Sequence, residues 1–416
     1  MRKMKDSGIE WIGQIPSDWD ISKIKYHCSM QSGDNLTSSD IEPEGEYEVY
    51  GANGFRGYYS RFNCEGVHIL VGRQGALAGN VHLVDGRYWA TDHAVITKIT
   101  DKTCVKFLYY SLVSADLNQY AFETAAQPGL AVSVIVNKSV PIPPLAEQQK
   151  IADFLDEKCG EIDSIRSDVQ REIEILNDYK KSVITEAVTK GLNPKAKLKD
   201  SGIEWIGKIP EEWNVIRLKN ASWLKGRIGW QGLRAEEFID EGPFLITGTD
   251  FQKGVVNWDT CVHISEQRFN QDKAIQIKEN DLLITKDGTI GKLAVVKNCP
   301  EKVSLNSGVF IIRNNGKYKY FDKYMYYVLQ SEQFNLWFDL SNAGNSTIKH
   351  LNQENFYNFA FTYPPLSEQK AIADYLDEKC SAIDATIADK QKQLETLDEY
   401  KKSLIFEYVT GKKEVS

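Results

Sequence analysis

Two long stretches of the chain place apolar residues at alternating steps of four and three. From Leu155 to Ala187 this spacing passes through ten positions, of which eight are apolar, and from Leu376 to Tyr408 it again finds eight in ten. A seam with a mean period of about 3.5 residues, sustained over several heptads, is typical of a coiled coil. The pattern predicts two helices of about 45 residues, each roughly 65–70 Å long at 1.5 Å per residue.

Two such helices in one chain most simply pair with each other. We expect the pair to be antiparallel, because each helix follows a region of similar plan. The prolines at 143–144 and 364–365 stand just before the helices, where they fix the entry of the chain without interrupting the interior. Lys180 and Lys401 interrupt the two seams at matching points. Each lysine either fixes the register of the pair or extends its charged end into solvent at a loose end.

The sequence repeats one long unit. PPLAEQQKIADFLDEKCGEID at 143–163 recurs as PPLSEQKAIADYLDEKCSAID at 364–384, 221 residues later. A shorter block, DSGIEWIGQIPSDW at 6–19, recurs at 200–213 with eleven of its fourteen positions identical. The chain therefore consists of a short block, a variable region and a long helix, followed by a second copy of each. The period of this repeat is far too long for a solenoid.

The short block stands at 200–213 directly after the first helix and at 6–19 before everything else. The last helix runs into VTGKKEVS, so we expect the N-terminal block to dock where a third unit would have begun, which closes the chain into a cycle. The apolar residues of both blocks are spaced for packing, which favours a scaffold over direct ligand contact. They are Ile9, Trp11, Ile12, Ile15, Trp19, Ile203, Trp205, Ile206, Ile209 and Trp213.

The two variable regions, roughly 20–142 and 214–363, read as mixtures of strands, helices and loops. The strand patterns are Val67–Val71, Ala94–Ile99, Phe244–Thr247, Asp281–Thr285, Leu293–Val296 and Val309–Ile312. Helical patterns follow at Val105–Ala115 and Tyr320–Phe338. Three landmarks relate the regions despite their low identity: GRQGALAGN at 72–80 with TKDGTIGK at 285–292, TDHAV at 91–95 with LNSGV at 305–309, and AAQPGLAVS at 125–133 with AGNSTIKHL at 343–351.

Glycine-rich loops let the backbone approach a ligand closely, but alone they are weak evidence for a site. Neither GxxxxGK[ST] nor GxGxxG is present, which argues against a nucleotide site. Basic, amide and aromatic residues accompany these loops, and Arg, Gln, Asn and Lys are side chains that read base edges or meet phosphates in DNA. We therefore predict a DNA-binding set of Arg56, Tyr58, Arg61, Arg73, Gln74, Arg227, Trp230, Gln231, Arg234, Lys286, Asp287, Lys292, Asn345 and Lys349.

Composition and charge narrow the class of protein. With 42% apolar and 26% charged residues over 416 positions, the chain is typical of a folded protein of two or more domains. It has no apolar run long enough for a membrane span and no apolar stretch behind its first charges, so we expect neither a membrane anchor nor a secretory signal. Seven scattered cysteines without a CxxC pair fit a reducing cytoplasm and argue against disulfides or zinc.

The net charge of −8 does not favour a nucleic-acid binder. Residues 20–142 hold 10 Lys and Arg against 13 Asp and Glu, and residues 214–363 hold 18 against 16. DNA binding would therefore need basic residues gathered on one face, or cationic partner subunits that supply the phosphate contacts.

Taken together, the two divergent regions, the PPLxEQ blocks that open helices with IAxxLDxK, and the GIEWIGxIPxxW blocks resemble the specificity subunit of type I restriction–modification systems. The resemblance covers essentially the whole chain. It implies an α+β fold with two α/β target-recognition domains joined by two long helices in an antiparallel coiled coil, with pseudo-two-fold and cyclic organisation. The implied boundaries are 1–142 and 200–363 for the recognition domains, and 143–199 and 364–416 for the spacer helices.

The same resemblance implies that the chain recognises DNA and does not itself catalyse a reaction. Each variable domain would read one half of a bipartite, asymmetric target in double-stranded DNA, and the coiled coil would set the gap and hold two methyltransferase subunits. Restriction subunits would complete the nuclease. AdoMet, ATP and Mg²⁺ would belong to those partner subunits, and no cofactor is expected in this chain.

The motifs that are missing agree with this reading. No NPP[FY] or DPPY segment for adenine methylation and no Walker lysine loop is present. The histidines, including His68, His82, His93, His263 and His350, lack metal-ligand spacing. Two alternatives stay open: a fused methyltransferase or nuclease, which the missing motifs oppose, and a coiled-coil adaptor with two protein-binding domains and no direct DNA readout.

Overall fold

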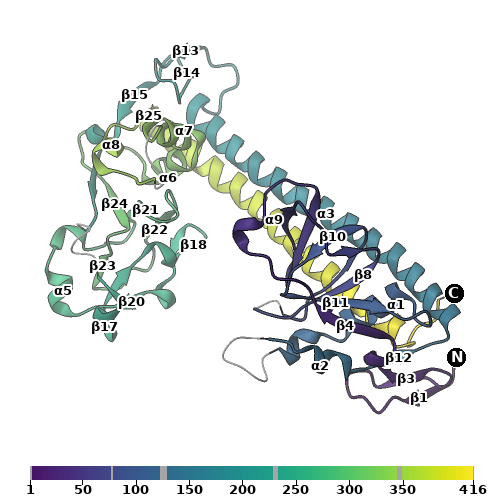
Figure 1. Ribbon diagram of the computed structural model, residues 1–416. Helices are drawn as coiled ribbons and strands as arrows, with labels where there is room; N and C mark the ends of the chain where they lie inside the picture. The colour runs from purple at the N-terminus through teal and green to yellow at the C-terminus, as the bar shows by residue number, and fades with distance from the viewer. Residues whose placement is uncertain (1, 76–77, 122–128, 228–232, 344–348, 416) are drawn as a thin grey trace. The chain divides into compact units, whose positions relative to one another are not determined.

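The computed structural model describes residues 2–75, 78–121, 129–227, 233–343 and 349–415. The chain divides into two compact units (Figure 1). Unit 1 comprises Met1–Arg171 with Lys390–Ser416, and unit 2 comprises Glu172–Asp389. Each long helix therefore contributes one part to each unit. Within the described ranges, no helix combines the length and apolar character needed to cross a bilayer.

The two predicted long helices are confirmed as α3, Leu145–Lys190, and α9, Leu366–Val409. In unit 1 the first part of α3 lies antiparallel to the last part of α9 (Figure 1). The ring of Phe154 lies 4.4 Å from that of Tyr408, and Arg166 lies 2.7 Å from Asp398. The partner number falls as the α3 number rises, as antiparallel pairing requires.

The seam in unit 2 runs in the same antiparallel sense. Lys180 of α3 lies 2.6 Å from Asp384 of α9, and in unit 1 Lys401 of α9 lies 2.7 Å from Asp163 of α3. Of the two roles left open for these lysines, the geometry favours the register: each seam lysine meets a carboxylate on the opposite helix at an equivalent place. The buried Cys159 and Cys380 lie on the seam as small hydrophobic residues.

Unit 1 carries two four-stranded sheets and two short antiparallel pairs. The sheets have the orders β6-β5-β10-β7 and β4-β11-β8-β9, and the pairs are β1-β2 and β12-β3. The strands are β1 Met4–Asp6, β2 Gln14–Pro16, β3 Asp20–Lys23, β4 Cys28–Ser32, β5 Tyr47–Gly51, β6 Gly54–Tyr59, β7 Cys64–Glu65, β8 His68–Gly72, β9 Val81–Val84, β10 Arg87–Ala90, β11 Ala94–Ile99 and β12 Ser139–Ile142. Helices α1, Val105–Ser114, and α2, Val132–Val136, pack beside the second sheet.

Unit 2 carries a six-stranded sheet, β16-β24-β21-β22-β19-β18, a three-stranded sheet, β20-β17-β23, and the pairs β13-β14 and β15-β25. The strands are β13 Leu198–Asp200, β14 Lys208–Pro210, β15 Asn214–Arg217, β16 Ser222–Lys225, β17 Ile239–Ile246, β18 Phe251–Gln252, β19 Val255–Val256, β20 Val262–His263, β21 Leu282–Thr285, β22 Leu293–Val295, β23 Val303–Leu305, β24 Val309–Asn314 and β25 Ala360–Tyr363. The shorter helices are α4 Leu218–Ala221, α5 Glu266–Asn270, α6 Asp322–Gln330, α7 Glu332–Ser341 and α8 Gln353–Tyr357.

The two units share one plan. The order β4-β11-β8-β9 in unit 1 matches β16-β24-β21-β22 in unit 2, and the parallel pair β5-β10 matches β17-β23. The strand closing each variable region, β12 or β25, pairs with the strand that follows the short block, β3 or β15. This agreement confirms the α+β repeat despite the low sequence identity between the variable regions.

One predicted helix is divided in the structure. The pattern from Tyr320 to Phe338 predicts a single helix, but α6 ends at Gln330 and α7 begins at Glu332. The residue between them, Ser331, has an extended backbone with ψ of 163°, and its hydroxyl donates to Val328 O at 2.7 Å. A serine side chain that bonds the preceding turn competes with the helical ladder, which explains the break.

A tryptophan of the short block fills the same corner in both units. In unit 1 the fully buried Trp19 donates from Nε1 to Glu147 Oε2 at 3.0 Å, in the first turn of α3. In unit 2 Trp213 donates from Nε1 to Glu368 Oε2 at 2.9 Å, in the first turn of α9. The block is thus tied to the start of one long helix in each unit, as the scaffold prediction requires.

The other long helix ends against the same tryptophan. Gly411 after α9 has φ of 68°, and a Cβ there would lie 3.0 Å from the Trp19 ring and 2.5 Å from Pro16. Gly191 after α3 has φ of 76°, and a Cβ there would lie 3.0 Å from the Trp213 ring. Only glycine combines the left-handed turn with this close approach. The N-terminal block thus occupies, beside α9, the place that the second block occupies after α3.

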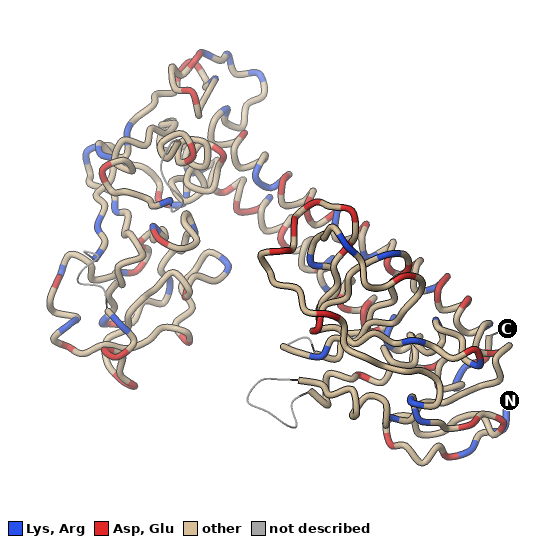
Figure 2. The backbone as a smooth tube through the Cα atoms, viewed as in Figure 1, with Lys and Arg blue, Asp and Glu red and all other residues tan. Residues whose placement is uncertain are grey.

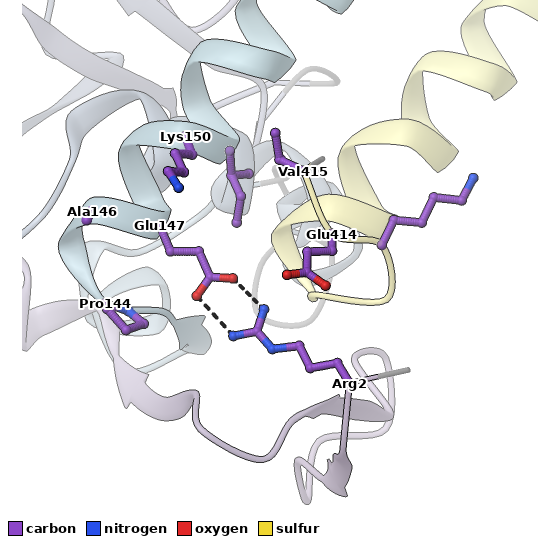
Figure 3. A pocket seen from close by; sticks show the side chains of 9 residues that line it. Arg2, Pro144, Ala146, Glu147, Lys150, Glu414 and Val415 are labelled. Atoms are coloured by element: carbon purple, nitrogen blue, oxygen red, sulfur yellow. Dashed lines mark hydrogen bonds and ion pairs between the residues drawn. The ribbon is translucent and has the colours of Figure 1, made fainter.

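In unit 1 an arginine strengthens this corner (Figure 3). Arg2 forms hydrogen bonds with both carboxylate oxygens of Glu147 and also pairs with Asp18 at 2.6 Å, and its guanidinium lies 5.4 Å from the Trp19 ring centre. These hydrogen bonds raise the pKa of Arg2 above its ordinary value. The ammonium of Lys412 donates to Ile12 O, so the segment after α9 also holds the block. In unit 1, ion pairs and hydrogen bonds thus hold the short block beside the end of α9. In unit 2 the second short block is joined to the end of α3 by the chain itself.

The substitution Glu147→Gln tests this closure, because the amide oxygen still accepts from Trp19 while the charge that pairs with Arg2 is gone. We expect faster amide hydrogen exchange in residues 9–19, equivalent to a loss of about 1–3 kcal/mol in local stability. Glu368→Gln is the matched control, since Glu368 has no ion pair among the residues described, and it should change exchange in 203–213 less. Equal effects of both variants would assign the loss to the tryptophan contact alone.

Candidate functional site

The glycine-rich loop that follows β8 is held by its main chain. The Arg73 amide donates to His93 O at 3.0 Å, and its carbonyl accepts from the Leu130 amide at 2.8 Å. The guanidinium of the half-buried Arg73 donates from Nη1 to Ser32 Oγ at 2.7 Å. Backbone bonds on both sides thus fix the position of the residue, and one side-chain bond orients it.

The hairpin turn between β5 and β6 packs against this loop. A Cβ at Gly72 would lie 2.2 Å from Ala52 O, so only glycine allows the two backbones to approach this closely. Asn80 donates from Nδ2 to Asn53 Oδ1 at 3.2 Å. A Cβ at Gly54 would lie 3.0 Å from the ring of His82 on β9. The turn therefore brings amide and imidazole groups next to the loop that carries Arg73.

A third segment, the link between β10 and β11, completes the cluster. The Thr91 amide donates to Tyr50 O at 2.9 Å, and the Asp34 amide donates to Ala90 O at 3.0 Å. Three buried polar atoms here have no hydrogen-bond partner among the described residues: His82 Nε2, Thr91 Oγ1 and Asp92 Oδ1. Burial also lowers the pKa of His82, which favours the neutral ring. Unpaired buried polar groups are costly, and a bound ligand is one way to satisfy them.

We call these segments of unit 1 the first loop cluster. It consists of residues 33–34, 52–54, 72–75, 78–82 and 91–93. All of them lie where strands of the two four-stranded sheets end or begin.

Unit 2 rebuilds the same frame with different side chains. The Lys286 amide donates to Gly308 O at 2.9 Å, and its carbonyl accepts from the Leu351 amide at 3.1 Å, as for Arg73. The Asn306 amide donates to Ile246 O at 2.9 Å, as Thr91 does to Tyr50 in unit 1. A Cβ at Gly248 would lie 2.9 Å from Thr285 Cγ2, the counterpart of the approach at Gly72. We call residues 247–250, 285–292, 306–308 and 349–351 the second loop cluster.

These bonds correct the landmark alignment. Ala94 pairs with Gly72 and Val309 with Thr285, so Ala94 corresponds to Val309 and not to Gly308. Likewise Leu130 corresponds to Leu351, three positions beyond the sequence alignment of 125–133 with 343–351. Strand pairing fixes the first shift and backbone hydrogen bonds fix the second, whereas short glycine-rich segments align equally well in several registers.

The second loop cluster differs from the first in its charged groups. Asp287 lies 2.7 Å from His350 Nδ1, and Lys349 lies 2.7 Å from Asp339. The ammonium of Lys286 lies 4.8 Å from the ring centre of Phe310, and the side chain of Lys292 is exposed. At equivalent positions, unit 2 thus carries the ammonium of Lys286 and the carboxylate of Asp287 where unit 1 carries the guanidinium of Arg73 and the amide of Gln74.

The structure brings some of the predicted residues into the two clusters and leaves others apart. Arg73 and Gln74 belong to the first cluster, and Lys286, Asp287, Lys292 and Lys349 belong to the second. Arg56 is exposed and reaches back to Gly51, where a Cβ would lie 2.6 Å from its Cδ. Tyr58 lies half-buried on β6, and Arg61 and Arg234 are exposed. Trp230, Gln231 and Asn345 lie outside the described residues.

Arg227 does not fit the predicted role of a surface contact. It is 2% exposed, and its guanidinium donates from Nε to Leu305 O at 2.8 Å and from Nη2 to Ser304 Oγ at 3.1 Å. The guanidinium thus bonds the end of β23 inside unit 2, where a surface contact cannot reach it. The GRIGWQGLR segment contains a structural arginine that composition alone does not distinguish from a binding one.

Sequence reasoning missed several polar residues of the first loop cluster. The predicted set lacks Asn53, Asn80, His82 and Asp92, although the landmarks 72–80 and 91–95 lie beside or contain them. The Asn53-Gly54 dipeptide was a usable signal, because Asn-Gly favours tight hairpin turns. The lack of a hydrogen-bond partner at His82 Nε2 and Asp92 Oδ1 had no signal, since it depends on packing between two sheets.

Charge is not gathered in either unit. Figure 2 shows Lys and Arg positions interspersed with Asp and Glu positions along the long helices and over the parts around the sheets. No group of three His, Cys, Asp or Glu side chains suited to a metal ion occurs in the part of the chain that the structure describes. The seven cysteines are free thiols, and six are buried.

Comparison with known proteins shows the family of the chain. A sequence model of the type I restriction modification DNA specificity domain matches residues 16–174 and again residues 210–396. The two matches together cover well over half of the chain. The chain belongs to this family. It is therefore a DNA-recognition subunit of a type I restriction–modification system, and catalysis lies in partner subunits.

Individual proteins agree with the family. The type I restriction enzyme MjaVIII specificity subunit of Methanocaldococcus jannaschii is 26% identical over 420 residues, which cover 96% of this chain and 94% of that protein. The type I restriction enzyme EcoprrI specificity subunit of Escherichia coli is 37% identical over 131 residues, or 30% of this chain and 32% of its own. A chain from a structural study of type I R-M complex assembly has a TM-score of 0.67 at 16% identity, covering 96% and 99% of the two chains, which supports the fold.

The substitution Arg227→Met separates the structural role from the predicted contact. We expect it to lower the free energy of unfolding by about 1–3 kcal/mol, because Leu305 O and Ser304 Oγ lose a charged donor in the interior. Arg234→Met is the matched control, since an exposed side chain should change stability by less than about 0.5 kcal/mol. Urea unfolding followed by circular dichroism measures both. Unchanged stability together with lost DNA binding would restore Arg227 to the contact set.

Proposed function

We propose that each loop cluster reads one half of a bipartite DNA target. The support is the repeated frame: Arg73 in unit 1 and Lys286 in unit 2 occupy equivalent places held by equivalent main-chain bonds. The side chains around them are donors and acceptors of the kinds that discriminate bases in the major groove. Because the two clusters differ in nearly every such side chain, the target is expected to be asymmetric.

The chemistry of each cluster suggests a different readout. Arginine and asparagine side chains, such as Arg73 and Asn53, form paired bonds to guanine and adenine edges. Lys286 supplies a point charge, and Asp287 accepts hydrogen bonds of the kind that cytosine donates.

We propose that partner subunits supply most of the phosphate contacts. Neither variable region is basic enough to account for strong phosphate binding, and the charges are mixed in both units. The isolated chain should therefore bind DNA weakly, and the assembled complex tightly and sequence-specifically.

We further propose that α3 and α9 set the spacing between the half-sites. The supporting observation is that each helix begins in one unit and ends in the other, with a seam lysine paired in each. Each residue added to or removed from the helices would then change the distance between the half-sites by about 1.5 Å.

The partners proposed are two modification subunits and, in the full complex, restriction subunits acting in the cytoplasm. AdoMet, ATP and Mg²⁺ would be bound by those subunits. Large apolar residues that are exposed and identical in both repeats support two equivalent docking places. Leu145 and Leu366 are 49% and 52% exposed at the starts of the long helices, and Tyr179 and Tyr400 are 55% and 56% exposed near their ends. Exposed residues repeated without a packing role in the chain are suited to a partner.

Arg73→Ala and Lys286→Ala test the DNA-reading proposal in the assembled complex. Each should weaken specific binding about tenfold or more, through the half-site of its own unit, since one good base contact is worth about 1–3 kcal/mol. Binding is measured on oligonucleotides with one or both halves scrambled, after methylated adenines have been mapped to define the target.

The control for this pair is Arg87→Ala. Arg87 lies at the opposite end of β10 from the first loop cluster and pairs with Glu65 at 2.9 Å, so its loss should leave specific binding unchanged. Unchanged DNA binding in both Arg73→Ala and Lys286→Ala would instead favour the adaptor without direct readout.

Leu145→Ser and Leu366→Ser test the docking proposal. Each should weaken binding of one modification subunit, because a partly exposed leucine covered by a partner contributes apolar burial of about 1–2 kcal/mol. The double variant should lose both copies, as native mass spectrometry of the mixture would detect. Ile175→Ser is the control, since Ile175 is 59% exposed but has Thr396 at the repeated position.

A further inference from the structure

The two long helices carry side chains of very different size at one equivalent position. Tyr408 of α9 and Ala187 of α3 are 221 residues apart and therefore correspond in the repeat, as do Phe154 of α3 and Tyr375 of α9. In unit 1 the ring of Tyr408 packs on Phe154 with centroids 4.4 Å apart and an interplanar angle of 37°. In unit 2 the corresponding pair is a methyl group and a ring.

An open pocket lies beside the smaller residue in unit 2. Its volume is about 470 Å³, and its lining includes Ala187, Val183 and Tyr375. Three exposed apolar residues form the rim, namely Tyr179, Leu192 and Leu198, with 55%, 40% and 40% exposure. Two further lining residues, Glu186 and Lys190, are opposite in charge and lie 3.9 Å apart, so the pocket does not select a charged group.

We propose that this pocket receives a large apolar or aromatic side chain of the modification subunit, so that unit 2 binds one copy more tightly than unit 1 binds the other. This inference rests on the proposed docking of two modification subunits. The chemistry of the occupant follows from unit 1, where the chain itself fills the equivalent place with a tyrosine ring. The position follows from Tyr179, which belongs both to the rim and to the repeated exposed residues of the docking surface.

The two units therefore offer one kind of partner two unlike surfaces. Unit 1 presents a place already filled by Tyr408, on which a partner side chain can only rest. Unit 2 presents a recess in which the same side chain is covered on several sides, and buried aromatic anchors in pockets dominate binding energy at interfaces. Assembly should then proceed in order, with unit 2 occupied first.

The test titrates the full chain with the modification subunit of the same system, followed by native mass spectrometry and calorimetry. For the wild-type chain we expect two binding steps whose dissociation constants differ about tenfold or more. Ala187→Tyr fills the pocket with the ring that unit 1 already accommodates. It should bring the tighter step to within about threefold of the weaker one, with an unchanged or higher melting temperature.

A second pair of variants leaves the core untouched. Tyr179→Ala on the rim of the pocket should weaken the tighter step, and Tyr400→Ala, its counterpart in unit 1, should weaken only the other. If Ala187→Tyr lowers the melting temperature, the Tyr179 and Tyr400 pair decides the question.

The outcomes distinguish unequal binding through the pocket from the docking of two modification subunits itself. Two equal steps in the wild-type chain, or a tighter step that survives both Ala187→Tyr and Tyr179→Ala, would overturn the inference while two-copy docking stands. Binding of no modification subunit would overturn both. An ordered titration that both pocket variants make equal supports it.

Discussion

The contact on which both units depend is the buried tryptophan between the start of one long helix and the end of the other. Trp19 and Trp213 each donate to a glutamate in the first turn of a helix and each cover a glycine that ends the opposite helix. Each ring thus ties together three segments that are far apart in sequence. Without it, the end of the second helix and the short block would both expose apolar surface, because neither buries enough area alone.

This constraint explains why the two copies of the short block differ so little in sequence. The block has to match the same two helix ends in both units, so its apolar residues and its tryptophan face the same steric limits. The variable regions contact the helices through side chains such as Tyr110 and Tyr327, which donate to Asp156 and Asp377 at 2.8 Å in each unit. Elsewhere their sequences are free to differ while the strand order stays the same.

The sequence predicted the helices, the repeat and the docking of the N-terminal block, because those features rest on periodicity and on identity between two copies. The interior role of Arg227 and the break at Ser331 were not predictable. Both depend on partners brought close only by the fold: carbonyl and hydroxyl groups of β23 for the arginine, and a serine hydroxyl that bonds the turn before it. The loop clusters were found in outline through their glycines, while Asn53, His82 and Asp92 join them through strand pairing that spacing along the chain does not encode.

The frame of the loop clusters also accounts for how two units on one plan come to differ. At Arg73 and at Lys286 the bonds that position the residue come from its amide and carbonyl, which every residue except proline supplies in full. The side chain is therefore not needed to hold the loop in place and can be exchanged without loss of the backbone. The opposite holds at Gly72, where a neighbouring backbone lies too close for any Cβ. The side chain can therefore change at the first kind of position, whereas the close contact needs a glycine on one of its two sides, which is Gly72 in unit 1 and Gly248, facing Thr285, in unit 2.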